Sequence, residues 1–215
     1  MDGPAGAGKS TLARIVARRL GYLYVDTGAM YRALALKALR LGIADTDREA
    51  LAAMGKATEV RLERTAEGGN RVFLDGEEVT AEIRTPAVSA VVSRVSAVPE
   101  LRALMVEQQR AMARSGGVVM DGRDIGSYVL PDADLKFFIT ASLQERARRR
   151  QAQLHAEGHH AELGKVEAEI ARRDEQDMNK GANSLVQLPE SIVIDTTGKN
   201  VEEVVAEILA HCRRA

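Results

Sequence analysis

The stretch Gly3-Pro4-Ala5-Gly6-Ala7-Gly8-Lys9-Ser10 decides the fold of this chain, because it matches the phosphate-loop pattern G-x-x-x-x-G-K-[ST] at every fixed position. Apolar residues from Leu12 to Leu20 recur at helical spacing, so a helix follows the loop, as the motif requires. The glycines let the backbone turn tightly, so that successive N–H groups and the helix N-terminus face an anion. A glycine-rich turn that binds nothing is disfavoured, because the pattern and the helix both fit. The motif therefore predicts a domain that uses ATP or GTP.

Two side chains of the loop have specific roles in this interpretation. Lys9 supplies a positive charge to the β- and γ-phosphate oxygens, and the Ser10 hydroxyl is placed to help hold Mg²⁺. ATP and Mg²⁺ are therefore the expected cofactors, with Ser10 as the metal ligand. The expected donor-binding residues are Gly3, Pro4, Ala5, Gly6, Ala7, Gly8, Lys9, Ser10 and Thr11.

Strand and helix patterns alternate along the rest of the chain. Short apolar runs predict strands at residues 22–26, 118–122, 135–140 and 191–195, and amphipathic patterns predict helices between them. This alternation implies a parallel sheet flanked by helices, with ligands bound at the carboxyl ends of the strands. The expected fold class is α/β, with a sheet of the P-loop NTPase type.

The start of the chain departs from the usual pattern. A phosphate loop normally follows a buried strand at the centre of the sheet, yet only Met1 and Asp2 precede Gly3. We therefore expect the first strand to be truncated. Two interpretations are open: a native chain that begins further upstream, or a shortened and inactive variant. We favour the first.

The segment from Val60 to Val79 has a different texture. Its short alternating runs are separated by Gly68-Gly69-Asn70 and by Asp75-Gly76, which are hairpin turn sequences. They predict a small antiparallel sheet inserted into the α/β chain. We expect a single domain spanning residues 1–215, with this insertion at about 55–85 and a helical lid at about 146–183.

Composition narrows the class of partner. Lysine plus arginine number 30 and aspartate plus glutamate 31, so no net positive charge favours nucleic acid or an anionic membrane. Cys212 is the only cysteine and cannot form an internal disulfide, and no apolar run approaches the roughly 20 residues that span a bilayer. No secretory signal pattern opens the sequence. We expect a soluble cytoplasmic protein that acts on small molecules.

Polar clusters mark the expected acceptor site. The runs Asp26-Thr27-Gly28-Ala29-Met30-Tyr31-Arg32 and Asp121-Gly122-Arg123-Asp124 come at the carboxyl ends of two predicted strands, where a P-loop kinase binds its acceptor. A third cluster is basic and lies on two polar helices that could close over phosphates, although each arginine taken singly fits a solvated helix face as well. Its members are Arg146, Arg148, Arg149, Arg150, Arg172, Arg173 and Lys180.

With these residues in view, the sequence resembles the bacterial cytidylate kinase family of P-loop nucleoside monophosphate kinases. The resemblance runs from the phosphate loop to the final helix, through GPAGAGKST, DTGAMYR, EIRTPAVSAVVSRVSAVPELR, DGRDIG, PDADLKFFITAS and ARRDEQDMNK in that order. It implies ATP-dependent phosphorylation of CMP and dCMP to CDP and dCDP by in-line phosphoryl transfer. It also implies a parallel core, an acceptor-binding insertion, a mobile lid and a monomer.

The resemblance also assigns residues. It places Arg32 and Arg123 on the acceptor phosphate with Thr27 nearby, a role that suits the bidentate guanidinium group. It places Ser93, Arg102 and Asp124 around the cytosine, and Arg173 and Asp177 near the ribose. Lys180 stands where the family often has arginine. The expected catalytic residues are Lys9, Arg123, Arg173 and Lys180, and the expected substrate-binding residues are Thr27, Arg32, Ser93, Arg102, Asp121, Arg123, Asp124, Arg173 and Asp177.

Two other functions remain open on the residues alone. One is a P-loop kinase for a different small acceptor, such as UMP, AMP or shikimate. The other is a nucleotide-binding module without turnover, which the truncated first strand would favour. ADP production that depends on a particular acceptor distinguishes these from a CMP kinase.

Overall fold

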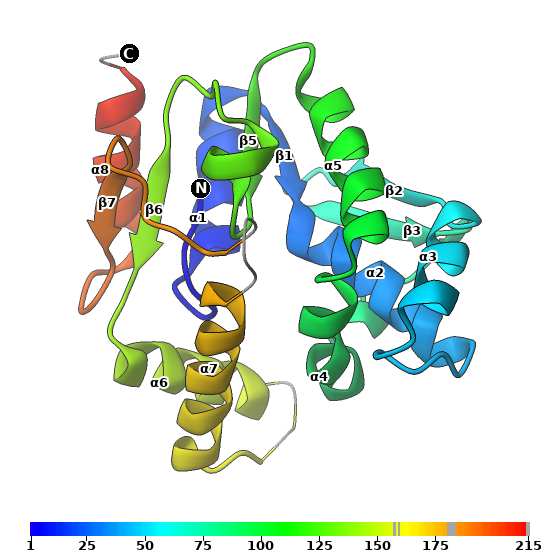
Figure 1. Ribbon diagram of the computed structural model, residues 1–215. Coiled ribbons are helices and arrows are strands. Elements are labelled where there is room, and N and C mark those ends of the chain that lie inside the picture. Colours follow the sequence, from blue (N-terminus) through cyan, green and yellow to red (C-terminus); the bar gives the residue numbers. More distant parts are fainter. Residues whose placement is uncertain (157, 159, 180–183, 214–215) are drawn as a thin grey trace. The chain divides into compact units, whose positions relative to one another are not determined.

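The computed structural model describes residues 1–156, 158, 160–179 and 184–213, and its chain forms two compact units (Figure 1). The continuous unit is Ala17–Asp121, and the split unit joins Met1–Val16 to Gly122–Ala215. Helix α1 (Lys9–Leu20) begins in the split unit and ends in the continuous one. Each unit has its own parallel strand pair and its own buried apolar residues.

The continuous unit is built on the first parallel pair. Strand β1 (Leu23–Asp26) lies beside β5 (Val118–Asp121), with Leu23 opposite Val118 and Asp26 opposite Asp121. The middle residues of both strands are buried, as in parallel pairs whose two faces are covered. Both strands end on an aspartate, so two carboxylates lie at the same edge of this pair.

Four helices lie between β1 and β5 in the chain. Asp26 caps the first of them, because its carboxylate accepts from the Ala29 N–H at 2.8 Å. Pro86 and Pro99 begin two others, at a position where the helix needs no N–H donor. The bounds are α2 (Thr27–Arg40), α3 (Arg48–Lys56), α4 (Pro86–Val95) and α5 (Pro99–Ala113), with the 3-10 turn η1 (Glu82–Arg84) before α4.

A small antiparallel sheet occupies the predicted insertion and confirms the hairpin pattern. Strand β2 (Val60–Arg64) pairs with β3 (Asn70–Leu74), and β3 pairs with β4 (Glu77–Glu78). Asp75 and Gly76 form the second turn with φ of 50° and 87°. Positive φ at both central residues is the requirement that selects Asp-Gly for tight hairpins.

The split unit contains the second parallel pair, β6 (Phe137–Thr140) beside β7 (Ile192–Asp195), drawn as adjacent arrows in Figure 1. Asp2 adds a parallel bridge to Phe138. The Asp2 N–H donates to the Phe137 carbonyl, and the Asp2 carbonyl accepts from the Ile139 N–H, both at 2.8 Å. The residue before the phosphate loop is therefore fixed to β6 by its backbone. The parallel pairs, flanking helices and small antiparallel sheet confirm the α/β class.

Two helices form a hairpin within the split unit, α6 (Leu143–Ala156) and α7 (Leu163–Met178). Their contact is apolar at Ala147, Val166 and Ile170. Ser142 caps the start of α6, because its hydroxyl accepts from the Glu145 N–H at 3.2 Å. The unit ends in α8 (Val201–Cys212), whose N-terminus carries a capping box.

An ion pair connects the two helices of this hairpin. Arg146 Nη1 lies 2.5 Å from Asp174 Oδ2, and the side chains are only 8% and 11% exposed. The guanidinium also donates to the carbonyls of Ala5 and Ala141, at 3.1 and 3.0 Å. Removing either member of this pair would leave the other charge buried without its partner, which strongly destabilises a folded protein.

A π-helical turn was not predicted from the sequence. The polar loop after β5 contains a π-helical turn, η2 (Ile125–Val129), in which the Tyr128 and Val129 N–H groups both donate to the Asp124 carbonyl, at 2.9 and 3.1 Å. Single π turns have no characteristic apolar spacing, so sequence periodicity does not detect them. Within the described residues, no helix is both long enough and apolar enough to cross a membrane.

Removing one member of the buried ion pair tests how the hairpin is held. We expect Arg146→Met to lower the free energy of unfolding by about 3 to 5 kcal/mol, because Asp174 is left buried and charged. Arg146→Met with Asp174→Leu should lose less, since the stranded charge is gone. Urea denaturation measures both. A single variant as stable as the parent chain would contradict this account.

Candidate active site

The phosphate loop follows a path that only glycine permits at two points. A Cβ on Gly3 would lie 1.9 Å from the Ile139 carbonyl oxygen, so the loop begins in direct contact with β6. Gly6 has a φ of 77° and would place its Cβ 3.1 Å from the Cβ of Arg146. The loop is therefore pressed between β6 and the start of α6.

Three carbonyls of the loop are each met by a donor. Lys9 Nζ donates to the Pro4 carbonyl at 2.7 Å, and Arg146 Nη1 donates to that of Ala5 at 3.1 Å. The single proton of the Thr196 hydroxyl is within hydrogen-bond distance of two carbonyls, that of Ala7 at 3.3 Å and that of Thr140 at 3.1 Å. In a trans peptide the following N–H points the opposite way. The N–H groups of Ala5, Gly6 and Gly8 are thereby turned away from these donors. This is the arrangement needed to bind an anion with backbone N–H groups.

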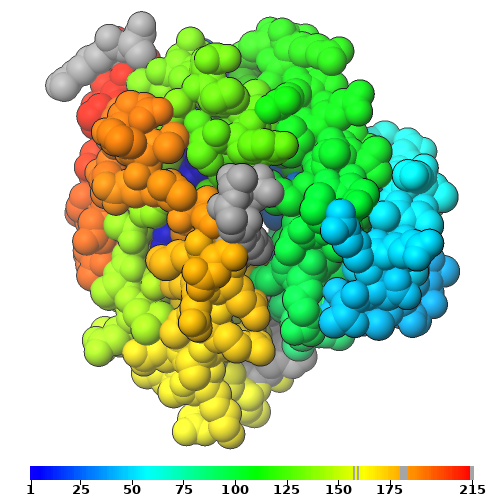
Figure 2. Space-filling model, viewed as in Figure 1, coloured from blue at the N-terminus to red at the C-terminus, as the bar shows by residue number. Residues whose placement is uncertain are grey.

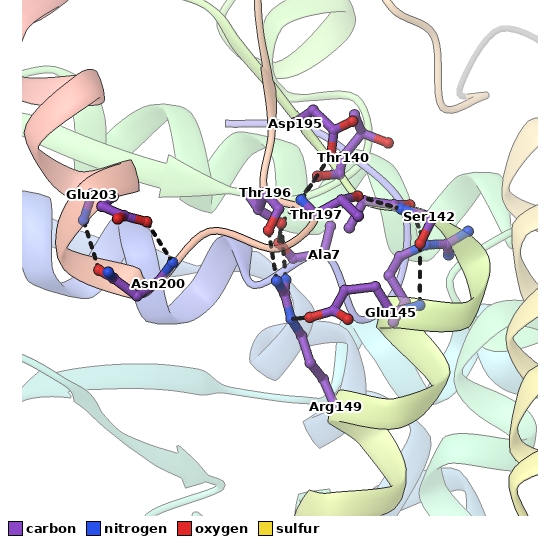
Figure 3. Close-up of polar contacts among 12 residues, drawn as sticks. Ala7, Thr140, Ser142, Glu145, Arg149, Asp195, Thr196, Thr197, Asn200 and Glu203 are labelled. Carbon is purple, nitrogen blue, oxygen red and sulfur yellow. Dashed lines mark hydrogen bonds and ion pairs between the residues drawn. The ribbon is translucent and has the colours of Figure 1, made fainter.

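A polar network supports this arrangement from the far side of the loop (Figure 3). Arg149 donates to Thr196 twice, to the hydroxyl at 2.9 Å and to the carbonyl at 2.7 Å. Its Nε donates to Glu145 at 2.9 Å, and the Ser142 N–H donates to the Thr197 hydroxyl at 2.9 Å. The start of α6 and the turn after β7 are thus tied together beside Ala7.

The basic cluster of the two helices therefore divides by burial. Arg146 is buried and Arg149 half-buried, and both hydrogen-bond to the loop or to its neighbours. Arg148 and Arg172 are exposed, as on an ordinary solvated helix face. Figure 2 shows α7, in amber, at the surface of the split unit. Lys180 lies outside the described residues.

Arg173 has a distinctive environment on α7. Burial, and next the positive charge of Arg123, lower its pKa to about 10, and Arg150 acts in the same direction against Asp177 and Glu169. Its Nε is buried and finds no hydrogen-bond partner among the residues that the structure describes. Positive charge is thus concentrated here beyond what the neighbouring carboxylates offset. An anion would relieve this repulsion.

Two other predicted residues of the split unit, Arg123 and Asp177, lie close to Arg173. Arg123 Nε donates to Asp177 Oδ2 at 2.6 Å, and Asp177 is only 2% exposed. Asp124 is buried immediately before η2. The structure therefore brings Arg123, Asp177 and Arg173 together in the unit that also carries the phosphate loop.

Three predicted residues of the continuous unit, Arg32, Ser93 and Arg102, lie on α4 or beside it. Arg32 Nη1 donates to the Ser89 hydroxyl at 2.9 Å and to the Ile83 carbonyl at 3.2 Å. Ser93 is buried on the same helix. Arg102, also buried, lies with its guanidinium carbon 5.7 Å from the centroid of the Tyr31 ring.

Thr27 and Asp121 meet at the edge of the β1–β5 pair. The Thr27 hydroxyl donates to the Asp121 carbonyl at 2.7 Å, and the Tyr24 hydroxyl donates to the Asp121 carboxylate at 2.9 Å. Asn70 supports this edge, since its side chain accepts from the Asp26 N–H at 3.3 Å and donates to the Tyr24 carbonyl at 3.0 Å.

Three contributors were not predicted: Asn70, Thr196 and Asp2. Asn70 was assigned only to a turn, and Thr196 lies after a strand that carried no motif. Asp2 is 8% exposed, and its carboxylate accepts from two N–H groups at the start of η2. Asp2 could have been identified from the sequence, because a charged residue is unusual directly before a phosphate loop, where a buried strand is expected.

Comparison with known proteins places this geometry in a family. A family model described as cytidylate kinase matches residues 1–214. A curated cytidylate kinase of Symbiobacterium thermophilum is 80% identical over 214 residues, covering 100% of this chain and 95% of that protein. Cytidylate kinases of Desulfitobacterium hafniense and Pelotomaculum thermopropionicum are 54% and 53% identical, each covering 98% of this chain and 90% and 93% of their own lengths.

Replacing Arg173 tests whether its charge is held for an anion. Because burial and Arg123 disfavour the charge, we expect Arg173→Met to raise the unfolding free energy of the free protein by about 1 kcal/mol. The same change should reduce the rise in melting temperature that ATP produces. Arg172→Met, on the same helix but exposed, is the control and should change neither value. A destabilised Arg173→Met protein with normal ATP stabilisation would refute this view.

Proposed function

We propose how the residues of this site share the reaction, starting from the fact that the chain belongs to the cytidylate kinase family. It transfers the γ-phosphoryl group of ATP to CMP and dCMP, giving CDP and dCDP, in pyrimidine nucleotide metabolism. Family membership does not favour a kinase for another acceptor or a binding module without turnover. The assignments of individual residues below are our own proposal.

The donor site is the phosphate loop. Its outward N–H groups bind the β-phosphate, and Lys9, whose ammonium group has three donors, adds phosphate oxygens to its contact with the Pro4 carbonyl. The observation that carries this assignment is that Lys9, Arg146 and Thr196 place donors within hydrogen-bond distance of three loop carbonyls. Without those donors the inward-facing carbonyls would be unsatisfied, and the conformation that turns the N–H groups outward would be unfavourable.

Mg²⁺ is the metal we assign to the donor site. The Ser10 hydroxyl is exposed in the first turn of α1 and is a hard oxygen donor. Among the described residues, no group of three or more His, Cys, Asp or Glu side chains could hold a metal ion. A single hydroxyl fits Mg²⁺, which takes few protein ligands and completes its shell with water and phosphate. When bound, the ion neutralises charge on the β- and γ-phosphates.

The acceptor phosphate is bound by Arg32 and Arg123, whose guanidinium groups offer bidentate, permanently charged contacts. Asp124 accepts from the N4 amino group of cytosine, with Ser93 and Arg102 beside the base. Uracil has a carbonyl at that position and would face the carboxylate without a donor. Arg173 and Asp177 approach the ribose, and Thr27 and Asp121 hold the strand edge near the acceptor.

Phosphoryl transfer then needs little covalent assistance from the protein. The attacking phosphate oxygen of the acceptor is already ionised, so no general base is required. Lys9, Arg123, Arg173 and Lys180 offset the charge that develops on the transferring group. We assign residues 1–215 to one kinase domain, with an acceptor-binding insertion at about 55–85 and a lid at about 146–183 that excludes water.

We propose that the protein works as a cytoplasmic monomer without nucleic-acid partners. The near balance of 30 basic and 31 acidic residues supports this, since it provides no field that would attract a polyanion. Size-exclusion chromatography with light scattering would measure the oligomeric state.

The assignment of Asp124 is tested by acceptor choice. We expect Asp124→Ala to lower the ratio of kcat/KM for CMP over UMP by at least about tenfold, because the contact with the N4 amino group is lost. ATP binding should be unchanged. Lys9→Ala should instead abolish transfer to every acceptor, and the exposed Asp132→Ala should alter nothing. If Asp124→Ala kept the parental ratio, Asp124 would not read the base.

A further inference from the structure

Asp2 is a buried carboxylate that the mechanism above does not use. Its two oxygens accept from the N–H groups of Ile125 and Gly126, each at 2.8 Å. Its own backbone is fixed to β6 through Phe137 and Ile139. The backbone that carries this carboxylate is therefore fixed, and the carboxylate hydrogen-bonds to a segment more than a hundred residues away in the chain.

The two N–H groups that Asp2 binds directly follow the acceptor-binding residues. The Ile125 N–H belongs to the peptide that joins it to Asp124, so holding this group fixes the backbone of Asp124. On the other side, the Gly122 N–H donates to the Met1 carbonyl at 3.0 Å. Residues 1 and 2 thus bracket the Arg123-Asp124 dipeptide at both of its ends.

The π-helical geometry explains why the start of η2 needs the two hydrogen bonds to Asp2. The carbonyl of Asp124 already accepts two N–H groups from within η2, at 2.9 and 3.1 Å. The first N–H groups of the turn have no carbonyl of their own turn to bind, and a buried N–H without a partner is strongly unfavourable. Asp2 meets two of them with a charged acceptor, which makes stronger bonds than a neutral one.

We propose that Asp2 is a positioning residue for acceptor recognition, which holds Arg123 and Asp124 in register with the phosphate loop that begins at Gly3. This inference rests on the proposed roles of Arg123 and Asp124. The proposed function assigns Asp2 no contact with acceptor or donor. Its effect passes through the backbone that follows Asp124, so it acts on the affinity and choice of acceptor more than on the binding of ATP.

Packing makes the contact specific for a carboxylate. A Cβ added to Gly126 would lie 3.4 Å from Asp2 Oδ2 and 3.2 Å from the Cδ of Lys136, so the turn is tightly enclosed. In Asp2→Asn the amide nitrogen would face an N–H donor and leave one of the two groups unsatisfied. The backbone bonds of residue 2 are retained in that variant. The change is therefore confined to the start of η2.

The experiment compares CMP and UMP as acceptors in Asp2→Asn and Asp2→Glu proteins. The ratio of kcat/KM for the two acceptors in one preparation does not depend on how much of the protein is folded. We expect Asp2→Asn to lower this ratio about tenfold and to raise the KM for CMP, with the KM for ATP changed less than about twofold. Asp2→Glu keeps two acceptor oxygens and should recover part of the ratio. If Asp2→Asn does not fold, Asp2→Glu must itself show a smaller loss in the same direction.

The control for a merely structural role is Asn200→Ala. It removes a helix cap in the same unit, where the Asn200 side chain accepts from the Glu203 N–H at 3.0 Å. We expect a lower melting temperature with an unchanged acceptor ratio. An equal fall of the ratio in this control would show that general destabilisation explains the Asp2 effect, and would overturn the inference.

Combining Asp2→Asn with Asp124→Ala separates this inference from the proposed function. If Asp2 acts through Asp124, the double variant should show the same acceptor ratio as Asp124→Ala alone. A loss that multiplies across the two sites, or an unchanged ratio in Asp2→Asn, would overturn the inference and leave the role of Asp124 standing. An unchanged ratio in Asp124→Ala would instead refute the proposed role of Asp124, and with it this inference.

Discussion

The constraint on which the site depends is that a loop cannot point its N–H groups at an anion without turning its carbonyls into the protein. Those carbonyls need donors. Here Lys9 provides one from within the loop, Arg146 provides another from α6, and Thr196 provides a third from the turn after β7. Because two of these donors come from the C-terminal half, the first residues of the chain must fold with it. The split unit, Met1–Val16 with Gly122–Ala215, is the consequence.

Charge in the split unit is divided between support and chemistry. Arg146 and Arg149 form ion pairs with Asp174 and Glu145 and hydrogen bonds with backbone carbonyls, and these contacts stabilise the loop. Arg173, in contrast, lies among positive neighbours at a pKa lowered to about 10, an arrangement that is unfavourable for the free protein. In the proposed function, a bound phosphate relieves this repulsion, so that Arg173 would lower the stability of the free protein and favour the bound state. In this account, some arginines of the two helices stabilise the fold, whereas Arg173 destabilises the free protein.

The sequence was sufficient for whatever depends on local pattern. The phosphate loop, the alternation of strands and helices, and the Asp75-Gly76 turn were predicted, because turn chemistry and apolar spacing are local. It was insufficient where a distant partner decides the outcome. The burial of Arg146 depends on Asp174 and Ala5, and that of Asp2 on the start of η2. No spacing rule in the arginine-rich stretch distinguishes a buried anchor from a phosphate ligand, and the π turn leaves no periodic trace.

The most direct measurement of the central claim is ADP release from ATP and Mg²⁺ by the purified chain, with CMP, dCMP, UMP and AMP supplied separately. The account predicts rapid ADP production with CMP and dCMP and little with UMP or AMP, since only the cytosine acceptors offer an N4 amino group to Asp124. Equal rates with all four acceptors would contradict the assignment of base recognition. ATP binding without ADP production from any acceptor would contradict phosphoryl transfer itself.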